Sequence, residues 1–233
     1  MRAPMSFATV ILALIIIPYG EGQLTQGERD EILDLHNNYR RWVQPAAANM
    51  EIMQWSDCLE QVAFDYLSTC PGFAHNNGRS TDAQALECEE SSYVGENLYK
   101  AGGSISNISK PVEAWYEEYV YYDINTMYCS NVCGHYTQIV WATSYLVGCS
   151  KFDASANCGS DTGTYFICNY APGGNINGVE PYATGSQCSQ CREGSDFCVD
   201  GLCSETSAAG RMASLCANLI CLMMLIFFFN VLS

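Results

Sequence analysis

Apolar side chains recur at helical spacing in three stretches of the chain. At the first, Thr25 and Glu28 have the form of a capping box. The residues that then repeat on one face are Ile32, Leu35, His36 and Tyr39. Pro45 ends the pattern, because proline has no amide hydrogen with which to continue a helix. The sequence therefore predicts a first helix between Thr25 and Pro45.

The second and third stretches show the same periodicity. Ser56 is placed to cap the second helix and Pro71 to end it, and the predicted buried stripe is Leu59, Val62, Ala63, Tyr66 and Leu67. Ser109 and Pro111 begin the third helix, whose predicted apolar face is Val112, Trp115, Tyr119 and Tyr122. Three amphipathic helices are thus expected within the first half of the chain.

Three glutamates in this region receive different interpretations. Glu118 borders the apolar face of the third helix, whereas Glu117 points elsewhere and is predicted to be a solvated surface charge. Glu96 has apolar neighbours on both sides, a poor setting for an unpaired carboxylate. We therefore expect Glu96 to reach water or to find a partner.

The second half of the chain has the pattern of strands. Residues 145–149 and 164–170 are rich in aromatic and branched side chains and are separated by polar sequence, which predicts an antiparallel pair. The short apolar run 136–141 fits either a strand or one helical turn. Residues 76–90 are polar and lack periodicity, so they are predicted to form a loop.

Both ends of the 233-residue chain resemble processing signals. Residues 1–22 combine Arg2, an apolar run and small residues, as a secretory signal peptide does. Residues 207–233 contain small residues at Ser207, a short spacer and an apolar tail, which indicates a glycosylphosphatidylinositol anchor attached at Ser207; a single-pass transmembrane tail is the alternative. The predicted location is extracellular, at the cell surface.

Fourteen cysteines in a chain of this length favour an oxidising compartment. Two of them, Cys216 and Cys221, lie in the apolar tail. The other twelve are disulfide candidates: Cys58, Cys70, Cys88, Cys129, Cys133, Cys149, Cys158, Cys168, Cys188, Cys191, Cys198 and Cys203. The last four lie in a hinge at 184–206 with few aliphatic residues, which disulfides or a metal must hold; disulfides are favoured, and the hinge is expected to fold separately from the main core.

The charge balance narrows the classes of partner. The formal net charge is −15 at pH 7. The electrostatic field of this negative charge repels phosphate backbones and anionic lipid headgroups, so we predict no nucleic-acid partner. Cations and neutral ligands are compatible with the charge.

The candidate chemistry centres on three histidines. His135 lies in the stretch from Gly134 to Trp141, just before apolar and aromatic residues and after the Cys129 and Cys133 pair. Burial by itself favours a hydrogen-bonded core histidine over a ligand. His36, on the apolar face of the first helix, is likewise predicted to make a structural hydrogen bond, and His75 follows the end of the second helix. Asn107 begins the sequon Asn-Ile-Ser, which predicts a glycosylated surface loop.

Two longer segments resemble the signature motifs of the CAP superfamily, which groups cysteine-rich secretory proteins, antigen 5 and pathogenesis-related proteins. They are Gly-His-Tyr-Thr-Gln-Ile-Val-Trp at 134–141 and Tyr-Phe-Ile-Cys-Asn-Tyr-Ala-Pro-Gly-Gly-Asn at 165–175. Shorter matches occur at residues 36–40, 70–75, 95–98 and 115–118. The resemblance covers residues 23–183.

The resemblance implies an α+β fold, a three-layer α-β-α sandwich with a small disulfide-rich C-terminal hinge. It further implies a central cleft at which His75, Glu96, Glu118 and His135 converge, with His75 and His135 able to hold Zn²⁺ or another divalent cation. In the hinge it implies bridges from Cys188 to Cys198 and from Cys191 to Cys203.

Two classes of function follow from the resemblance. The favoured one is a binding module that engages a lipid, a sterol or an extracellular protein. The alternative is a metal-assisted hydrolase that uses Glu96 or Glu118 as general base. The sequence has neither an HExxH helix nor a GxSxG elbow, which favours the binding module and leaves no residue assigned as catalytic.

Overall fold

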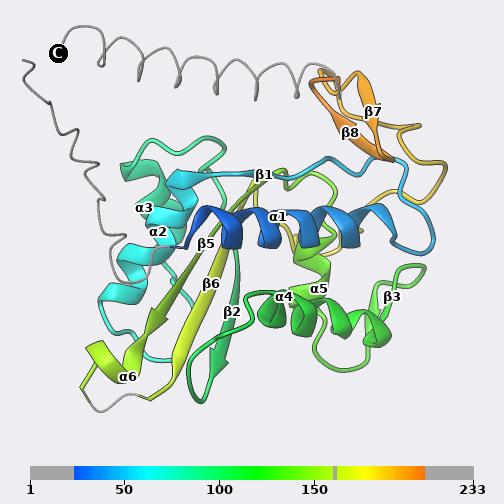
Figure 1. Ribbon diagram of the computed structural model, residues 1–233. Coiled ribbons are helices and arrows are strands. Elements are labelled where there is room, and N and C mark those ends of the chain that lie inside the picture. Colours follow the sequence, from blue (N-terminus) through cyan, green and yellow to red (C-terminus); the bar gives the residue numbers. More distant parts are fainter. Residues whose placement is uncertain (1–23, 160–161, 208–233) are drawn as a thin grey trace, which may run out of the picture. The chain divides into compact units, whose positions relative to one another are not determined.

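The computed structural model describes residues 24–159 and 162–207 (Figure 1). The helices are α1 (Gln26–Arg41), α2 (Asp57–Ser68), α3 (Arg79–Ala85), α4 (Ser109–Tyr116), the 3₁₀ helix η1 (Glu117–Tyr121), α5 (Gly134–Ile139) and α6 (Ala154–Asn157). The strands are β1 (Gln54–Trp55), β2 (Gly95–Ala101), β3 (Tyr122–Asp123), β4 (Tyr128–Cys129), β5 (Leu146–Asp153), β6 (Thr164–Ala171), β7 (Phe197–Val199) and β8 (Leu202–Ser204).

The predicted signal peptide and the apolar tail after Ser207 lie outside the described residues, as do Cys216 and Cys221. Within 24–159 and 162–207, no helix has the length and hydropathy needed to cross a bilayer. Asn107, the predicted glycosylation site, is exposed, and its side-chain oxygen accepts a hydrogen bond from the backbone nitrogen of Ser109 at 3.0 Å. Glycosylation at Asn107 and lipid attachment at Ser207 stay predictions.

A four-stranded sheet forms the centre of the fold, with strand order β1-β5-β6-β2. β5 pairs antiparallel with β6, and β6 pairs antiparallel with β2, while the short β1 runs parallel to β5. The antiparallel pair predicted from residues 145–149 and 164–170 is therefore confirmed. All of β6 is buried, because it has a strand on each side and helices over both faces.

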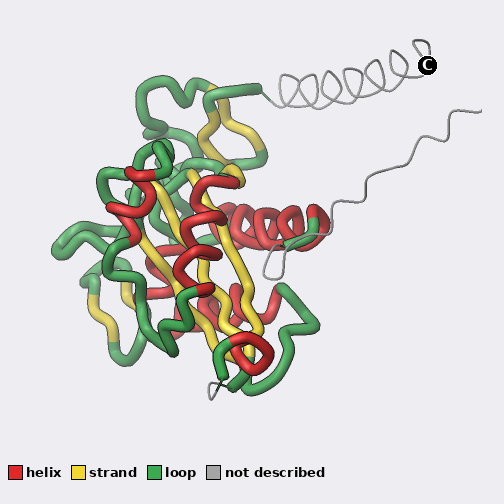
Figure 2. The backbone as a smooth tube through the Cα atoms, turned by 90° about the vertical axis from the view of Figure 1, so that its left-hand side faces the viewer, coloured by secondary structure: helices red, strands yellow, loops and turns green. Residues whose placement is uncertain are grey.

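Side chains on β6 alternate between the two faces of the sheet, as the pleat of a strand requires. Tyr165 and Ile167 pack with Ala63 and Leu67 of α2. Phe166, Cys168 and Tyr170 belong to the larger apolar cluster that contains residues of α1, α4 and α5. The result is the three-layer α-β-α arrangement implied by the resemblance (Figures 1 and 2).

The first two helices begin where their capping residues predict. The Thr25 hydroxyl accepts from the Glu28 backbone nitrogen, and the Glu28 carboxylate accepts from the Thr25 backbone nitrogen, which completes the capping box. The Ser56 hydroxyl accepts from the backbone nitrogen of Leu59 at the start of α2. Each pair satisfies amide hydrogens that otherwise lack a partner at a helix start.

The loop prediction for residues 76–90 is wrong in its centre, where the structure has the seven-residue helix α3. Only Ala83 of this helix is buried, so there was no apolar periodicity to detect. The helix follows a turn in which the Asn76 side chain accepts from the Gly78 backbone nitrogen, and the disulfide from Cys58 to Cys88 holds the segment that follows it. Local turn chemistry and a crosslink stabilise it in place of an amphipathic face.

The third predicted helix is shorter than expected. α4 ends at Tyr116 and continues as the tighter η1, so the four predicted residues do not share one face. Val112 and Trp115 are buried as predicted, but Tyr119 is 51% exposed. The change in helical pitch rotates the residues after Tyr116 out of the stripe. The ambiguous run 136–141 is resolved in favour of a helix, α5.

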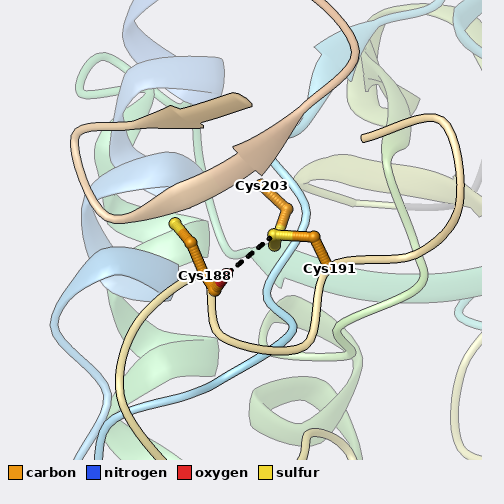
Figure 3. Close-up of side chains that lie close together, drawn as sticks. All are labelled: Cys188, Cys191 and Cys203. Atoms are coloured by element: carbon orange, nitrogen blue, oxygen red, sulfur yellow. Dashed lines mark hydrogen bonds between the residues drawn. A yellow bond between two sulfur atoms is a disulfide. The ribbon is translucent and has the colours of Figure 1, made fainter. Parts of the chain in front are cut away.

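All twelve disulfide candidates are paired in six disulfides. The pairs are Cys58–Cys88, Cys70–Cys158, Cys129–Cys133, Cys149–Cys168, Cys188–Cys198 and Cys191–Cys203. The hinge pairing is the one that the resemblance implies, and Figure 3 shows Cys191 beside Cys203. Cys149–Cys168 joins β5 to β6, and Cys70–Cys158 joins the end of α2 to the end of α6. Six disulfides are expected of a protein from an oxidising compartment.

The expectation of a separately folding hinge is not met. Leu202 of β8 is fully buried in the main core cluster. Cys203 donates its backbone N–H to the Met50 carbonyl at 2.8 Å, and the Cys203 carbonyl accepts from Ile52 at 2.9 Å. Arg192 also forms an ion pair with the buried Glu51 carboxylate at 3.4 Å. The prediction rested on the low apolar content of the hinge. The hinge contacts the main core mostly through backbone hydrogen bonds and one leucine, which apolar content does not reveal.

Candidate functional site

The first half of the candidate site is a pair formed by His75 and Glu96. His75 Nδ1 lies 2.6 Å from Glu96 Oε1, which also accepts from the backbone nitrogen of Asn76 at 3.0 Å. The Glu96 side chain is only 1% exposed, whereas that of His75 is 52% exposed. The buried carboxylate thus has the partner that its apolar neighbours in the sequence required. It holds the histidine ring at the surface through Nδ1.

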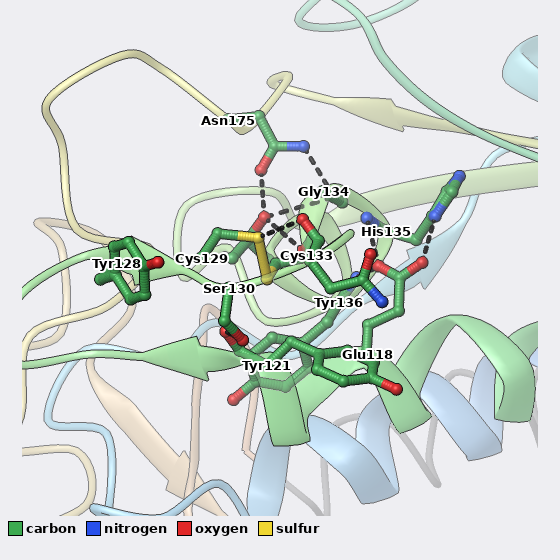
Figure 4. The surroundings of a disulfide bond; sticks show 12 residues. Glu118, Tyr121, Tyr128, Cys129, Ser130, Cys133, Gly134, His135, Tyr136 and Asn175 are labelled. Atoms are coloured by element: carbon green, nitrogen blue, oxygen red, sulfur yellow. Dashed lines mark hydrogen bonds and ion pairs between the residues drawn. A yellow bond between two sulfur atoms is a disulfide. The ribbon is translucent and has the colours of Figure 1, made fainter.

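The second half is a pair formed by His135 and Glu118 (Figure 4). Glu118 Oε1 lies 2.6 Å from His135 Nδ1, and Oε2 accepts from the backbone nitrogens of His135 at 3.0 Å and of Tyr136 at 3.2 Å. The carboxylate therefore caps the first turn of α5 while it orients the imidazole. Trp115 stacks on the His135 ring with centroids 6.0 Å apart, which fixes the ring plane.

Glu117, next to Glu118, is exposed, as predicted. The 3₁₀ turn of η1 directs only the second of these adjacent glutamates toward α5. The different roles foreseen for the two residues follow from this turn. Glu117 is consequently a useful control for Glu118.

A single residue of β2 connects the two pairs. Asn97, directly after Glu96, donates from its side-chain nitrogen to the backbone carbonyl of His135 at 3.0 Å. The edge strand β2 thereby supplies the carboxylate for one histidine and supports the backbone of the other. The four residues named by the resemblance come from four segments: the loop after α2, β2, η1 and α5.

The chemistry of these donors fits a divalent metal. With Nδ1–H donated to a carboxylate, each histidine keeps Nε2 as a lone-pair donor, the arrangement common among metal-binding histidines. Glu96 Oε2 is buried and has no hydrogen-bond partner among the described residues. His75 and His135 would therefore act as ligands, and Glu96 and Glu118 would orient them.

The four residues do not form a closed ligand shell. In the part of the chain that the structure describes, the only three candidate ligand atoms within 4.8 Å of one another belong to Cys188, Cys191 and Cys203 (Figure 3). The sulfurs of these cysteines are engaged in disulfides, so they offer no thiolate to a metal.

A buried polar network supports α5 from behind. His36 donates from Nδ1 to the Ile32 carbonyl at 2.8 Å and accepts from the Tyr170 hydroxyl at 2.9 Å, and that hydroxyl accepts from Asn97 at 3.2 Å. Burial lowers the pKa of His36 to about 4 and raises the pKa of Tyr170. The prediction that His36 has a structural role is confirmed, since the structure buries it completely and bonds both ring nitrogens.

Arg40 holds the chain that leaves α5. Its guanidinium is fully buried and donates five hydrogen bonds, all to backbone carbonyls; the acceptors belong to Glu51, Ile139, Trp141 and Ala142. Burial lowers the pKa of Arg40 to about 9. The sequence analysis assigned Arg40 no role of its own. The available signal in the sequence was a charged residue at the end of the apolar face of the first helix.

The disulfide between Cys129 and Cys133 lies directly before α5, the helix that carries His135 (Figure 4). The Cys133 carbonyl accepts from the Thr137 backbone nitrogen at 2.9 Å, so the bridged residue begins α5. Asn175 accepts from the Thr137 hydroxyl at 2.6 Å and donates to the Gly134 carbonyl at 2.8 Å. These contacts hold the start of α5 from two sides.

Gln138 is a further residue that the sequence analysis missed. It is 1% exposed; its amide oxygen accepts from the Gly174 backbone nitrogen at 2.9 Å, and its nitrogen donates to Ser144 at 3.1 Å. A Cβ on Gly95 would lie 2.1 Å from that amide oxygen, so the close approach requires glycine. The signal in the sequence was an amide side chain within the apolar run 136–141, because a buried amide needs hydrogen-bond partners.

Comparison with known sequences identifies relatives. The profile of the cysteine-rich secretory protein family, named CAP, matches residues 33–170, a range that contains all four site residues. GLIPR1-like protein 1 of Bos taurus is 41% identical over 175 residues, which cover 75% of this chain and 70% of that protein. Peptidase inhibitor 16 of Mus musculus is 35% identical over 184 residues, which cover 77% of this chain and 34% of that protein.

Solved structures show the same fold. The crystal structure of Na-ASP-1 has a TM-score of 0.63 and 26% sequence identity, and the match covers 79% of this chain and 49% of that one. The crystal structure of NaASP2 with Zn²⁺ has a TM-score of 0.60 and 25% identity, and the match covers 78% of this chain and 97% of that one.

Proposed function

Because the chain belongs to the cysteine-rich secretory protein (CAP) family, we propose that it is an extracellular binding protein whose His75, Glu96, Glu118 and His135 hold a divalent metal ion. The observation that carries this proposal is the matched pair of contacts at 2.6 Å from a histidine Nδ1 to a glutamate. The crystal structure of NaASP2 with Zn²⁺, a protein of the same fold, supports it.

The residues of this chain have distinct tasks in the proposal. A bound divalent ion would supply a positive centre for an oxygen of a ligand or of water. His75 and His135 bind through Nε2, while Glu96 and Glu118 orient the rings and offset the positive charge. Asn97 holds the backbone of His135, so the position of one ligand depends on the strand that carries the partner of the other.

The hydrogen bonds favour binding over hydrolysis. A general base needs a carboxylate oxygen that is free to take a proton from water. Both oxygens of Glu118 already accept hydrogen bonds, and Oε1 of Glu96 accepts two. Glu96 Oε2 has no partner among the described residues but is buried. The carboxylates are therefore arranged to hold histidines.

Isothermal titration of the purified protein with Zn²⁺ tests the metal site. We expect wild-type protein and the Glu117→Ala control to bind alike, and the His75→Ala/His135→Ala double variant to lose binding. Unchanged binding by the double variant, with its thermal unfolding still cooperative, would disprove the assignment.

A peptide library incubated with the Zn²⁺-saturated protein tests the hydrolase alternative. The proposed function predicts no turnover that depends on Glu96. If turnover occurs and Glu96→Gln abolishes it while Zn²⁺ binding is retained, the hydrolase interpretation replaces the binding module.

A further inference from the structure

An open apolar groove lies beside the start of α5. Two adjoining cavities of about 450 and 540 Å³ share Met127, Trp141, Ile176, Gly178 and Val179 in their walls. The lining comes from the β3–β4 hairpin, from α5 and the residues beside it, and from the segment after β6; Asn49 contributes to one of the cavities. Because five residues line both cavities, they form one continuous groove.

The walls of this groove are unusually apolar for a surface. Met127, Ile176 and Val179 are 42%, 50% and 49% exposed, respectively. Tyr121 and Tyr128, which adjoin the lining residues Tyr122 and Met127 in the sequence, are 42% and 66% exposed. Methionine and tyrosine are enriched where proteins bind one another, and a grouped apolar surface of this kind marks an interaction site.

Acidic side chains border the groove. Glu180 lines one of the cavities, and Tyr122 lines the other. Asp123 directly follows Tyr122 in β3, and the carboxylates of Glu180 and Asp123 contribute, after burial, to raising the pKa of Tyr122. The Asp123 carboxylate accepts hydrogen bonds from the Thr126 hydroxyl at 2.9 Å and from the Asn125 backbone nitrogen at 3.0 Å, and these bonds lower its pKa.

The described residues that line the groove include no cation to offset these carboxylates. Neither cavity has a lysine or an arginine in its wall. The sequence contains none between Lys110 and Lys151, and none between Lys151 and Arg192. The segments that build the groove therefore present apolar contacts and negative charge together.

We propose that this groove binds a segment of another protein in which Lys or Arg residues lie beside aliphatic ones. The aliphatic side chains would occupy the groove, and the cationic groups would meet Glu180, Asp123 and the exposed tyrosine rings. The acidic border disfavours a second copy of this chain and an anionic membrane, since both would bring like charge to it.

The groove is separate from the proposed metal site. Gly134 and Cys133 at the start of α5 belong to its wall, but neither His135 nor Glu118 does. The inference consequently goes beyond the proposed function and needs no metal. Its test is carried out in excess chelator, so that failure of metal binding has no influence on the result.

Fluorescence anisotropy of the full-length protein with three labelled peptides of equal length provides the test. One peptide alternates Leu and Arg, the second alternates Ser and Arg, and the third alternates Leu and Glu. We expect the Leu/Arg peptide to bind at least about tenfold more tightly than either of the others, a difference of about 1.4 kcal/mol. Its affinity should fall as salt is added, because salt screens the charged contacts.

Matched variants locate the binding. Ile176→Ser/Val179→Ser and Glu180→Gln should each weaken the Leu/Arg peptide about tenfold. The controls are Leu86→Ser, at a residue that is 44% exposed, and Glu89→Gln, at an exposed residue; neither residue lines the two cavities. Both controls should leave the affinity unchanged. All the substituted side chains are exposed, so the variants should fold.

Two results would overturn the inference. The first is equal affinity for the Leu/Arg and Ser/Arg peptides, or an equal loss in the groove variants and the controls, which would reveal non-specific attraction to an acidic protein. The second is binding of a neutral fluorescent sterol that the groove variants remove while the Leu/Arg peptide stays unaffected by them. That outcome would assign the groove to a lipid.

Discussion

The buried histidine of α1 makes the stability of this protein sensitive to acid in a way that can be measured. His36 is fully buried, and burial lowers its pKa from an ordinary 6.5 to about 4. Both ring nitrogens are hydrogen-bonded, to Ile32 and to Tyr170. Glutamine offers one donor and one acceptor without a charge change, so His36→Gln removes the titration and keeps a related bonding pattern.

The sign and size follow from the two pKa values. Between pH 6.5 and about 4 the unfolded chain binds a proton at His36 that the folded chain does not bind. Stability from this residue is therefore complete above pH 6.5 and is lost as the pH falls toward 4, by up to about 3 kcal/mol. Most of that loss, about 2.5 kcal/mol, should be reached at about pH 4.5.

Urea denaturation followed by tryptophan fluorescence, with the disulfides intact, measures this directly. The loss of unfolding free energy between about pH 7 and about pH 4.5 should be larger in wild type than in His36→Gln by about 2 to 3 kcal/mol. Other titrating groups are common to both proteins and cancel in this comparison. An equal pH dependence in the two proteins, with the variant well folded at neutral pH, would refute the role assigned to His36.

Three further predictions concern the core, the site and the buried arginine. Leu202→Ala should lower the free energy of unfolding by about 2 to 5 kcal/mol in urea titration, and Val199→Ala, on the same hairpin but only half-buried, by less than about 1 kcal/mol. Glu118→Gln should weaken Zn²⁺ binding about 10- to 100-fold in calorimetry, whereas Glu117→Gln should not change it. Arg40→Lys keeps the charge but reduces five donors to three, so thermal unfolding should show a loss of about 2 kcal/mol or more, and unchanged stability would contradict the role assigned to the guanidinium.

The elements that sequence patterns predicted are those whose determinants are local. The capping box at Thr25 and Glu28 and the cap at Ser56 lie within one turn of the helices they begin. α3 lacks such a pattern, because its stability comes from the Asn76 turn and from a disulfide to Cys58. The change from α4 to η1 was not predicted either, because the apolar residues of both elements recur along the sequence at the spacing of a single α-helix.

The residues of the candidate site were predicted, but the contacts between them were not. The resemblance to the CAP family named His75, Glu96, Glu118 and His135, and each histidine contacts one of the glutamates. Which glutamate forms a hydrogen bond with which histidine depends on the strand pairing of β2 and on the 3₁₀ turn of η1. The role of Asn97 depends on them too, since it reaches from β2 to α5. No spacing along the chain encodes such a contact.

The hinge shows how backbone groups can link a cysteine-rich appendage to a functional site. Its hairpin adds hydrogen bonds between Cys203 and the segment from Met50 to Ile52. Within that segment, the Glu51 carbonyl accepts two hydrogen bonds from Arg40, which also holds the carbonyls that follow α5. Removing the hinge would leave the amide of Ile52 and the carbonyl of Met50 without their present partners, beside the carboxylate of Glu51. The hinge is therefore bound, through one buried arginine, to the helix that carries His135.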